Sequence, residues 1–340
     1  MKTQRTNTRF DYTSLTKCEN RSMLVLPQSQ KPLVFIMGLH RSGTTFLYES
    51  MSDYFEAAKL TVRDIVFYPQ LITLMQQSQL DEKNNAISEY FKSANCDKRG
   101  NDNIALSSDT AEEYGWILKR WGGEYKSNES TLSLLQEVID KLAFMHPNKQ
   151  AIMLKNPWDI GQGNVLAKAF PNAKFVFIKR SPEEILSSEI NNALHFTQHE
   201  DPLLKLLSNK IKITQTLTII FRLLRKVLSE LQFTKLISKL LISDIVSNLE
   251  KYLNDIKAIP AQQVMEISYS SLVEKPQDTF ESLSLFLELR TKPMAELPIA
   301  KRAKKKINPI VDFAAEKLKQ RIKENGLERF LKDKPANDLK

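Results

Sequence analysis

Eight consecutive residues, Gly38-Leu39-His40-Arg41-Ser42-Gly43-Thr44-Thr45, combine the residue types that bind a phosphate or sulfate group. Two glycines let the backbone turn its N–H groups toward an anion, and Arg41 adds a positive charge. The hydroxyls of Ser42, Thr44 and Thr45 add further donors. Residues 44–55 carry apolar side chains at helical spacing, so the loop opens a helix whose dipole also attracts an anion. The segment predicts a site for an anionic ligand.

The loop has the spacing of the phosphate loop of nucleotide-binding proteins, with one difference. The pattern G-x-x-x-x-G-K-[ST] places lysine where this chain has Thr44. In ATP and GTP hydrolases that lysine reaches the terminal phosphates. None of the later predicted strands ends in an apolar run followed by a carboxylate that would hold Mg²⁺. We therefore expect a phosphate-bearing nucleotide, no bound metal and no metal-assisted phosphoryl transfer.

A second candidate site follows another apolar run. Arg180 comes directly after residues 174–178, and Ser188 lies eight residues further on. Pro182 suits the first turn of a helix, and the next two glutamates suit its positive end. Eight residues make slightly more than two helical turns, so Arg180 and Ser188 can meet at one anion. Taken alone, an exposed arginine explains this pair equally well.

Four apolar runs predict the elements that hold these residues. Residues 33–37, 151–154, 174–178 and 264–268 have the continuous hydrophobicity of strands buried on both faces. Helical stretches such as 163–170 separate them. This alternation predicts an α/β fold with three layers, in which a parallel sheet of the phosphate-loop type has helices on both faces. Ligands collect at the carboxyl ends of such strands, and the polar residues above all lie there.

Composition narrows the classes of protein. The 340 residues are 42% hydrophobic and 26% charged, which is too apolar for a disordered chain. A net charge of +9 suits an anionic ligand without implying nucleic acid. Two cysteines exclude a disulfide scaffold and a cysteine-rich zinc site. No apolar run is long enough to span a bilayer, so we expect a cytoplasmic protein.

The chain divides into three parts. Residues 1–30 lack periodicity and are expected to be a tail, 31–300 form the α/β domain, and 301–340 hold a basic run and a C-terminal helix. Residues 203–256 are rich in Leu, Ile, Lys and Ser and predict an amphipathic helical insertion in that domain. Packing against the domain is the simpler role for this insertion, and a peripheral contact with a membrane surface is the other.

The loop resembles the 5′-phosphosulfate loop of sulfotransferases that use 3′-phosphoadenylyl sulfate. Three further blocks resemble that family in the same order: 154–157 its lysine loop, 170–182 continuing to Ser188 its 3′-phosphate motif, and 269–273 a fourth block. Together they span roughly residues 31–290. The arginine loop and the lysine loop are most similar to the branch that includes protein-tyrosine and related bacterial sulfotransferases.

The resemblance implies transfer of a sulfuryl group to a hydroxyl or amine acceptor by in-line displacement, with release of adenosine 3′,5′-bisphosphate. Residues 41–45 (Arg41, Ser42, Gly43, Thr44 and Thr45) would hold the 5′-phosphosulfate. Arg180 and Ser188 would hold the 3′-phosphate, assisted by Tyr269. Lys155 would neutralise the bridging or sulfuryl oxygens, although a solvated lysine at a strand end explains it too.

The catalytic base is assigned by position relative to the related branch, where a glutamate precedes a proline-bearing apolar stretch. Asp64 stands at the corresponding place, one methylene shorter, and a surface salt bridge with Arg63 is the alternative. His40 either contacts the sulfuryl group or fills space. Glu112 and Glu113 either line the acceptor site or begin a helix.

Two further groups have competing explanations. His195 and His199 share a helix face without an evident third ligand, which argues against zinc. The basic run 301–306 either closes over the cofactor or is a solvated face.

Two other functions stay open. One is a nucleotide kinase or NTPase with a degenerate loop, and the other is a non-catalytic nucleotide-binding scaffold. The acceptor is a small-molecule, glycan, lipid or peptide hydroxyl, and neither its identity nor the oligomeric state can be derived from the sequence.

Overall fold

The structure is a computed structural model that describes residues 26–96, 98, 105–198, 201–208, 212–293 and 311–332, except for the side chains of 212–215, 217 and 218. The predictions for residues 1–25, for His199 and for the basic run 301–306 concern residues outside this description.

In the described chain, four parallel strands form one sheet in the order β2-β1-β3-β4. The strands are β1 (Leu33–Met37), β2 (Ile152–Lys155), β3 (Lys174–Lys179) and β4 (Val264–Ser268). All four lie where the apolar runs predicted them. Strand β2 begins and ends one residue later than expected, so Lys155 is the last residue of the strand rather than part of a loop.

Side-chain alternation along β1 shows why the sheet needs cover on both sides. Leu33, Phe35 and Met37 belong to one hydrophobic cluster, whereas Val34 and Ile36 belong to another. All five side chains are buried. The sheet therefore separates two cores, as expected for a parallel sheet between helical layers.

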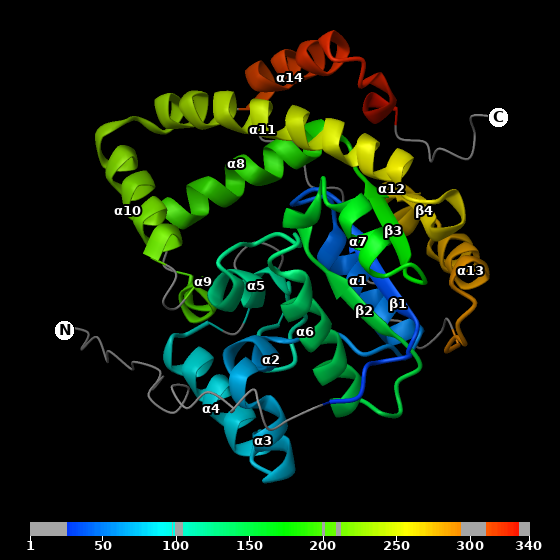
Figure 1. Cartoon of the computed structure of the whole chain (residues 1–340). Helices are drawn as coiled ribbons and strands as arrows, with labels where there is room; N and C mark the ends of the chain where they lie inside the picture. The colour runs from blue at the N-terminus through cyan, green and yellow to red at the C-terminus, as the bar shows by residue number, and fades with distance from the viewer. Residues whose placement is uncertain are drawn as a thin grey trace, which may run out of the picture.

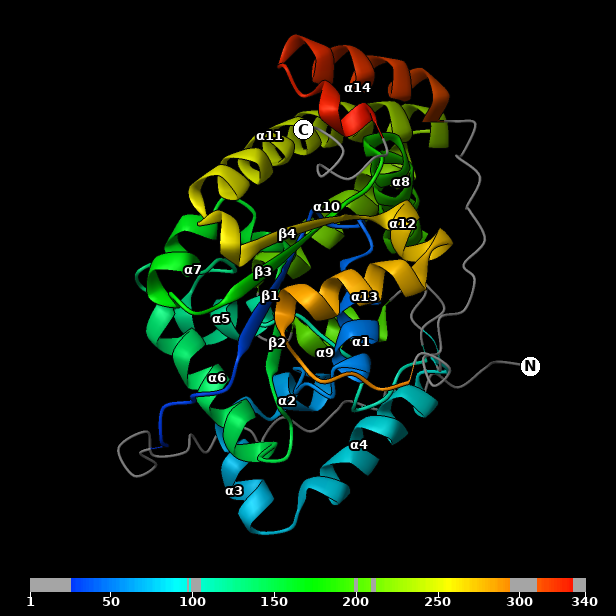
Figure 2. The same cartoon turned by 90° about the vertical axis from the view of Figure 1, so that its right-hand side faces the viewer.

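Helices follow the strands and fill both layers (Figures 1 and 2). They are α1 (Thr44–Tyr54), α2 (Val62–Val66), α3 (Leu71–Gln76), α4 (Leu80–Ser93), α5 (Gly115–Gly122), α6 (Leu132–Met145), α7 (Gly163–Ala169), α8 (Pro182–Gln198), α9 (Pro202–Leu207), α10 (Lys212–Val227), α11 (Glu230–Ala258), α12 (Tyr269–Glu274), α13 (Pro276–Leu287) and α14 (Asp312–Glu324). Helices α1, α12 and α13 supply the core that contains Val34 and Ile36. Helices α6, α7, α8, α11 and α14 supply residues to the other core.

The predicted helical insertion consists of α9, α10 and α11. Helix α11 packs against α8, α7 and α14, and α10 packs against α8 and α11 (Figure 1). Asp255 of α11 reaches the segment after β2, where its carboxylate accepts hydrogen bonds from the N–H groups of Gly161 at 2.6 Å and Gly163 at 2.9 Å. None of the described helices is both long and apolar enough to cross a membrane.

The segment after α14 returns to the sheet. Glu266 of β4 is almost buried and forms an ion pair with Arg329. Tyr252 of α11 also donates to the Glu266 carboxylate, at 3.0 Å. Beside it, Lys179 at the end of β3 donates to the carbonyl oxygen of Lys332 at 3.0 Å. These contacts place residues 329 and 332 at β4, which is an edge strand, and at its neighbour β3.

Candidate functional site

The loop between β1 and α1 turns at two residues with left-handed backbone conformation. Arg41 has a φ of 64° and Gly43 a φ of 100°. Ser42 stabilises the turn, because its N–H and its hydroxyl both donate to the carbonyl oxygen of Leu39, at 3.1 and 2.7 Å. Gly43 stands at the N-cap of α1 and has no side chain that could cap the first turn. The first N–H groups of α1 therefore point toward the loop, as in an anion-binding helix terminus.

Tyr269 lies directly against this loop. A Cβ atom added to Gly43 would lie 2.5 Å from Cδ2 and 2.7 Å from Cε2 of the Tyr269 ring. The guanidinium carbon of Arg180 lies 4.3 Å from the centre of the same ring, which is a cation–π distance. Three blocks far apart in the sequence thus meet at the carboxyl ends of β1, β3 and β4.

Arg41 connects the two candidate sites, because this loop residue contacts both Arg180 and Ser188. Its Nε donates to Ser188 Oγ at 3.0 Å, and its carbonyl oxygen accepts from Arg180 Nη1 at 2.9 Å. Arg180 also forms an ion pair with Glu184 one helical turn further on, at 2.8 Å. Arg180 and Ser188 therefore both contact Arg41. Their meeting at one anion stays a prediction.

Lys155 is buried at the end of β2, with a side chain that is 0% exposed. Its Nζ donates to Thr45 Oγ1 at 2.9 Å and lies 3.0 Å from Glu113 Oε1. A solvated lysine is therefore excluded. A buried ammonium group needs a nearby carboxylate and hydrogen-bond acceptors to offset its lost hydration, and Glu113 and Thr45 provide both.

Glu113 was one of two carboxylates with competing explanations, and the structure brings it to the site. Its side chain is 16% exposed and stands just before α5. Hydrogen bonds fix the residues on both sides of Glu113. The Tyr114 hydroxyl donates to the buried carboxylate of Asp159, and the N–H of Glu112 donates to the Leu60 carbonyl oxygen at 3.0 Å. Burial raises the pKa of Asp159. No sequence spacing indicates this ion pair, because its two residues are 42 positions apart.

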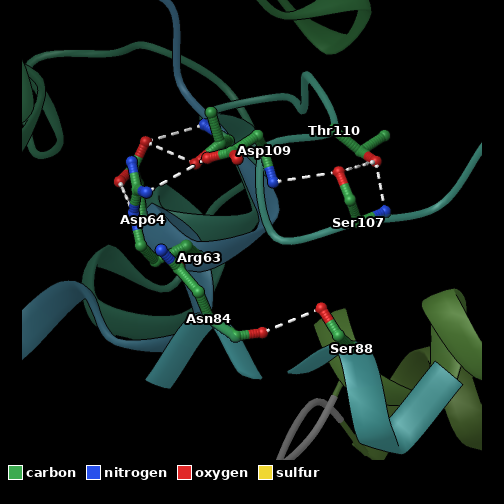
Figure 3. A network of polar contacts seen from close by, with 8 residues as sticks. Arg63, Asp64, Asn84, Ser88, Ser107, Asp109 and Thr110 are labelled. Atoms are coloured by element: carbon green, nitrogen blue, oxygen red, sulfur yellow. Dashed lines mark hydrogen bonds and ion pairs between the residues drawn. The ribbon is translucent and has the colours of Figure 1, made fainter. Parts of the chain in front are cut away.

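Asp64 stands at the start of α2 (Figure 3). Its Oδ2 accepts from the N–H and the hydroxyl of Thr61, both at 2.8 Å, and its Oδ1 lies 3.3 Å from Arg63 Nε. The side chain is 0% exposed, so the ion pair with Arg63 is buried on the Asp64 side rather than a surface pair. Both carboxylate oxygens thus bind the residues that begin α2. The assignment of Asp64 as the base stays a prediction.

Two side chains near the loop add to its surroundings. The His40 ring lies edge-on to the Trp158 ring, with 5.1 Å between centroids, and Trp158 stacks on Tyr125 at 4.5 Å. Glu189, next to Ser188 on α8, faces the positive charges of the loop. Burial raises the pKa of the Glu189 carboxyl, and the charges of His40 and Arg41 oppose that rise. Neither the aromatic group nor Glu189 was predicted from the sequence.

The hydroxyls of the loop differ in what they contact. The Ser42 hydroxyl is used within the loop, and the Thr45 hydroxyl accepts from Lys155. Thr44 is buried, and its methyl carbon would lie 2.9 Å from a Cβ atom at Gly38. Three cationic side chains lie at the carboxyl ends of the strands, around a loop of N–H donors. They are Arg41, Lys155 and Arg180.

Residues 32–217, more than half of the chain, match the profile of the sulfotransferase family. The solved structure of sulfotransferase STF1 from Mycobacterium tuberculosis H37Rv is similar over 86% of this chain and 77% of its own, with 16% identity and a TM-score of 0.57. Sulfotransferase STF9 from Mycobacterium avium is similar over 88% and 76%, with 14% identity and a TM-score of 0.55. At these identities the two structures show the fold. No curated protein matches.

Proposed function

Because this chain belongs to the sulfotransferase family, we propose that it moves a sulfuryl group from 3′-phosphoadenylyl sulfate to a hydroxyl or amine acceptor. The observation that carries the proposal is the meeting of Arg41, Ser188 and Arg180 around one loop at the carboxyl ends of β1 and β3. The donor has an anionic group at each end of one adenosine. The loop proposed for the 5′-phosphosulfate directly contacts the two residues proposed for the 3′-phosphate. Such an arrangement suits a donor with an anionic group at each end.

The loop fits the 5′-phosphosulfate. Gly43 has a left-handed backbone and packs so closely on the Tyr269 ring that a Cβ atom would clash with it, and the N–H groups at the start of α1 are the natural partners of a phosphate. Arg41 adds charge at the same place. The 3′-phosphate would take Arg180, whose planar guanidinium is suited to phosphate, and Ser188. Tyr269 supports this end by packing on the Arg180 guanidinium.

Lys155 is the residue we assign to the leaving group. In the transfer, the acceptor oxygen forms a bond to sulfur while the bond from sulfur to the 5′-phosphate oxygen breaks. The electron pair goes to that oxygen, which develops negative charge. A lysine held without water beside Thr45 stabilises such charge more strongly than an exposed one would. Arg41 would stabilise the same charge from the loop.

A binding experiment separates this function from the two alternatives. Adenosine 3′,5′-bisphosphate should raise the melting temperature of the chain, and a chelator should leave that rise unchanged. Transfer of labelled sulfate from 3′-phosphoadenylyl sulfate to a panel of alcohols, phenols, sugars and peptides then tests catalysis. Stabilisation by ATP only with magnesium would instead indicate a kinase or NTPase. Tight bisphosphate binding without donor turnover would indicate a scaffold.

A further inference from the structure

We propose that Glu113 is the general base that takes the proton from the acceptor. This assignment rests on the proposed function. It starts from the contact between Glu113 Oε1 and Lys155 Nζ, at 3.0 Å. Lys155 also donates to Thr45, at the end of the phosphate-type loop and the start of α1, so one ammonium group links the Glu113 carboxylate to the loop.

Exposure distinguishes the two members of the pair. Lys155 is 0% exposed and Glu113 is 16% exposed. The carboxylate is therefore the member that an acceptor arriving from solvent can reach. The ammonium group is the buried member, and it contacts Thr45 of the loop. This division suits an in-line reaction, in which the acceptor and the leaving oxygen lie on opposite sides of the sulfur.

Asp64 lacks this arrangement. Its two oxygens bind Thr61 and Arg63, and its side chain is 0% exposed. A base must lie within hydrogen-bond reach of the proton that it removes. In the transfer, Glu113 accepts the acceptor proton while the new oxygen–sulfur bond forms, and the bond to the 5′-phosphate oxygen breaks. The proton ends on Glu113, and the negative charge ends on the released bisphosphate beside Lys155.

Replacing Glu113→Gln tests this role, because glutamine keeps the length of the side chain and an oxygen for Lys155 but accepts no proton. We expect turnover with phenol to fall by about 100-fold or more, within the usual range for losing a general base. The loss with 4-nitrophenol should be much smaller when both acceptors are assayed at pH 8, because most of the 4-nitrophenol is ionised at that pH and phenol is not. Transfer to water, read as hydrolysis of 3′-phosphoadenylyl sulfate, should fall with the phenol rate and requires no knowledge of the natural acceptor.

Bisphosphate binding separates the failure of this assignment from the failure of the function. The variant should keep the thermal stabilisation by adenosine 3′,5′-bisphosphate, and Glu281→Gln on the exposed face of α13 is the matched control. Equal losses with both phenols would show that Glu113 only positions Lys155, and retained hydrolysis would also overturn the assignment. A wild-type chain without stabilisation by the bisphosphate would overturn the proposed function itself.

A separate observation concerns α10, and it does not depend on the reaction. Ile219, Ile220, Leu223 and Val227 are 57%, 45%, 56% and 84% exposed. Their spacing places them on one face of the helix. The fold does not require this face, because Phe221 and Leu224 of α10 and Leu228 directly after it pack against the core from the other side. Helix α10 is therefore apolar on two sides.

Charge identifies the occupant of the exposed face. Residues 212–240 contain six basic residues and one acidic residue, Glu230, which pairs with Arg225 at 3.2 Å. Lys226, Lys235 and Lys239 are exposed. From the apolar stripe on α10 and the excess of positive charge in residues 212–240 we infer that α10 lies on an anionic membrane surface. A second copy of the chain would bring the same positive charges together.

Vesicle sedimentation tests the inference. The wild-type chain should sediment with phosphatidylcholine vesicles that contain phosphatidylglycerol, and much less with phosphatidylcholine alone. The double variant Leu223→Glu, Val227→Glu should reduce the bound fraction by about tenfold, since it removes apolar contact and adds negative charge. Leu285→Glu is the matched control, because Leu285 of α13 is 82% exposed and lies on another helix.

Two results would overturn it. One is equal sedimentation of the wild-type chain and the double variant. The other is a wild-type dimer in light scattering that the double variant converts to a monomer, without vesicle binding by either. The melting temperature of the double variant should equal that of the wild-type chain, since both positions are exposed.

Discussion

The guanidinium group of Arg180 donates a hydrogen bond to the backbone carbonyl oxygen of Arg41, with 2.9 Å between Nη1 and O. The two residues are 139 positions apart and belong to two different strand–loop units. The contact fixes the Arg180 guanidinium relative to the backbone of the phosphate-type loop, so a ligand with two anionic ends meets a site of preset spacing. Binding then requires less ordering of the protein, which favours affinity.

Arg180→Ala should lower the affinity for adenosine 3′,5′-bisphosphate. The change removes the guanidinium that we assign to the 3′-phosphate and also its bond to the Arg41 carbonyl. Charge-assisted hydrogen bonds of this kind contribute about 1.5–3 kcal/mol each, so titration calorimetry should show a loss of at least about tenfold. Arg180→Lys should recover part of the affinity, because it restores the charge without the planar group. A change of less than threefold in the alanine variant would contradict the assignment.

Gly43→Ala should damage the loop for two reasons. Its φ of 100° is unfavourable for alanine, and the new Cβ atom would lie 2.5 Å from the Tyr269 ring. We expect a lower melting temperature and a loss of bisphosphate affinity in the same titration. Gly123→Ala is the matched control, because Gly123 has a φ of 86° and nothing within 4 Å of the added atom. If both variants lose affinity equally, the Tyr269 contact is not responsible.

Asp64→Ala separates stability from catalysis. The change removes the acceptor for Thr61 and the partner of Arg63, so the free energy of unfolding should fall by about 1–3 kcal/mol in urea titrations. Turnover per folded molecule should fall much less than in Glu113→Gln. The opposite pattern, unchanged stability with turnover lost, would favour the assignment of Asp64 as the base.

Asp255 should make stability depend on pH. Burial raises the pKa of its carboxyl from 3.8 to about 6, although the N–H groups of Gly161 and Gly163 oppose the rise. The folded chain thus holds the proton more tightly than the unfolded chain. The contribution of Asp255 to the free energy of unfolding is therefore greatest below pH 4 and is lost as the pH rises through 6. A shift of two units corresponds to about 3 kcal/mol at most.

The pH dependence is measured by comparison with Asp255→Asn, which does not titrate. As the pH rises from 4 to 7, the melting temperature of the variant should increase relative to that of the wild-type chain. Other carboxylates titrate in both proteins and cancel in the difference. A difference that stays constant over this range would contradict the raised pKa.

The sequence predicted the sheet because each strand is a continuous apolar run buried on both faces. Residues 33–37 and 264–268 form strands with the expected bounds, and the polar residues after each strand meet at one edge. They meet because all the strands are parallel, so that their carboxyl ends lie on the same side of the sheet. Periodicity also indicated helices between 203 and 256, but it could not show which apolar face of α10 packs inside.

The ion pair between Glu113 and Lys155 could not be predicted, because it depends on how α5 packs against the segment after β2. The contact is close: a Cβ atom on Gly115 would lie 2.5 Å from Asn156 Oδ1. The cap at Asp64 did have a sequence signal. Thr61 and Asp64 stand three residues apart before an apolar stretch, which is the spacing of a capping box.

The contacts of Arg329 with Glu266 and of Lys332 with Lys179 decide how far the chain can be shortened. A version that stops at residue 326 would remove a cation from a nearly buried carboxylate in β4 and an acceptor from the ammonium group at the end of β3. Expression trials that trim the C-terminus should therefore retain residues through 332, or the yield of folded protein will drop.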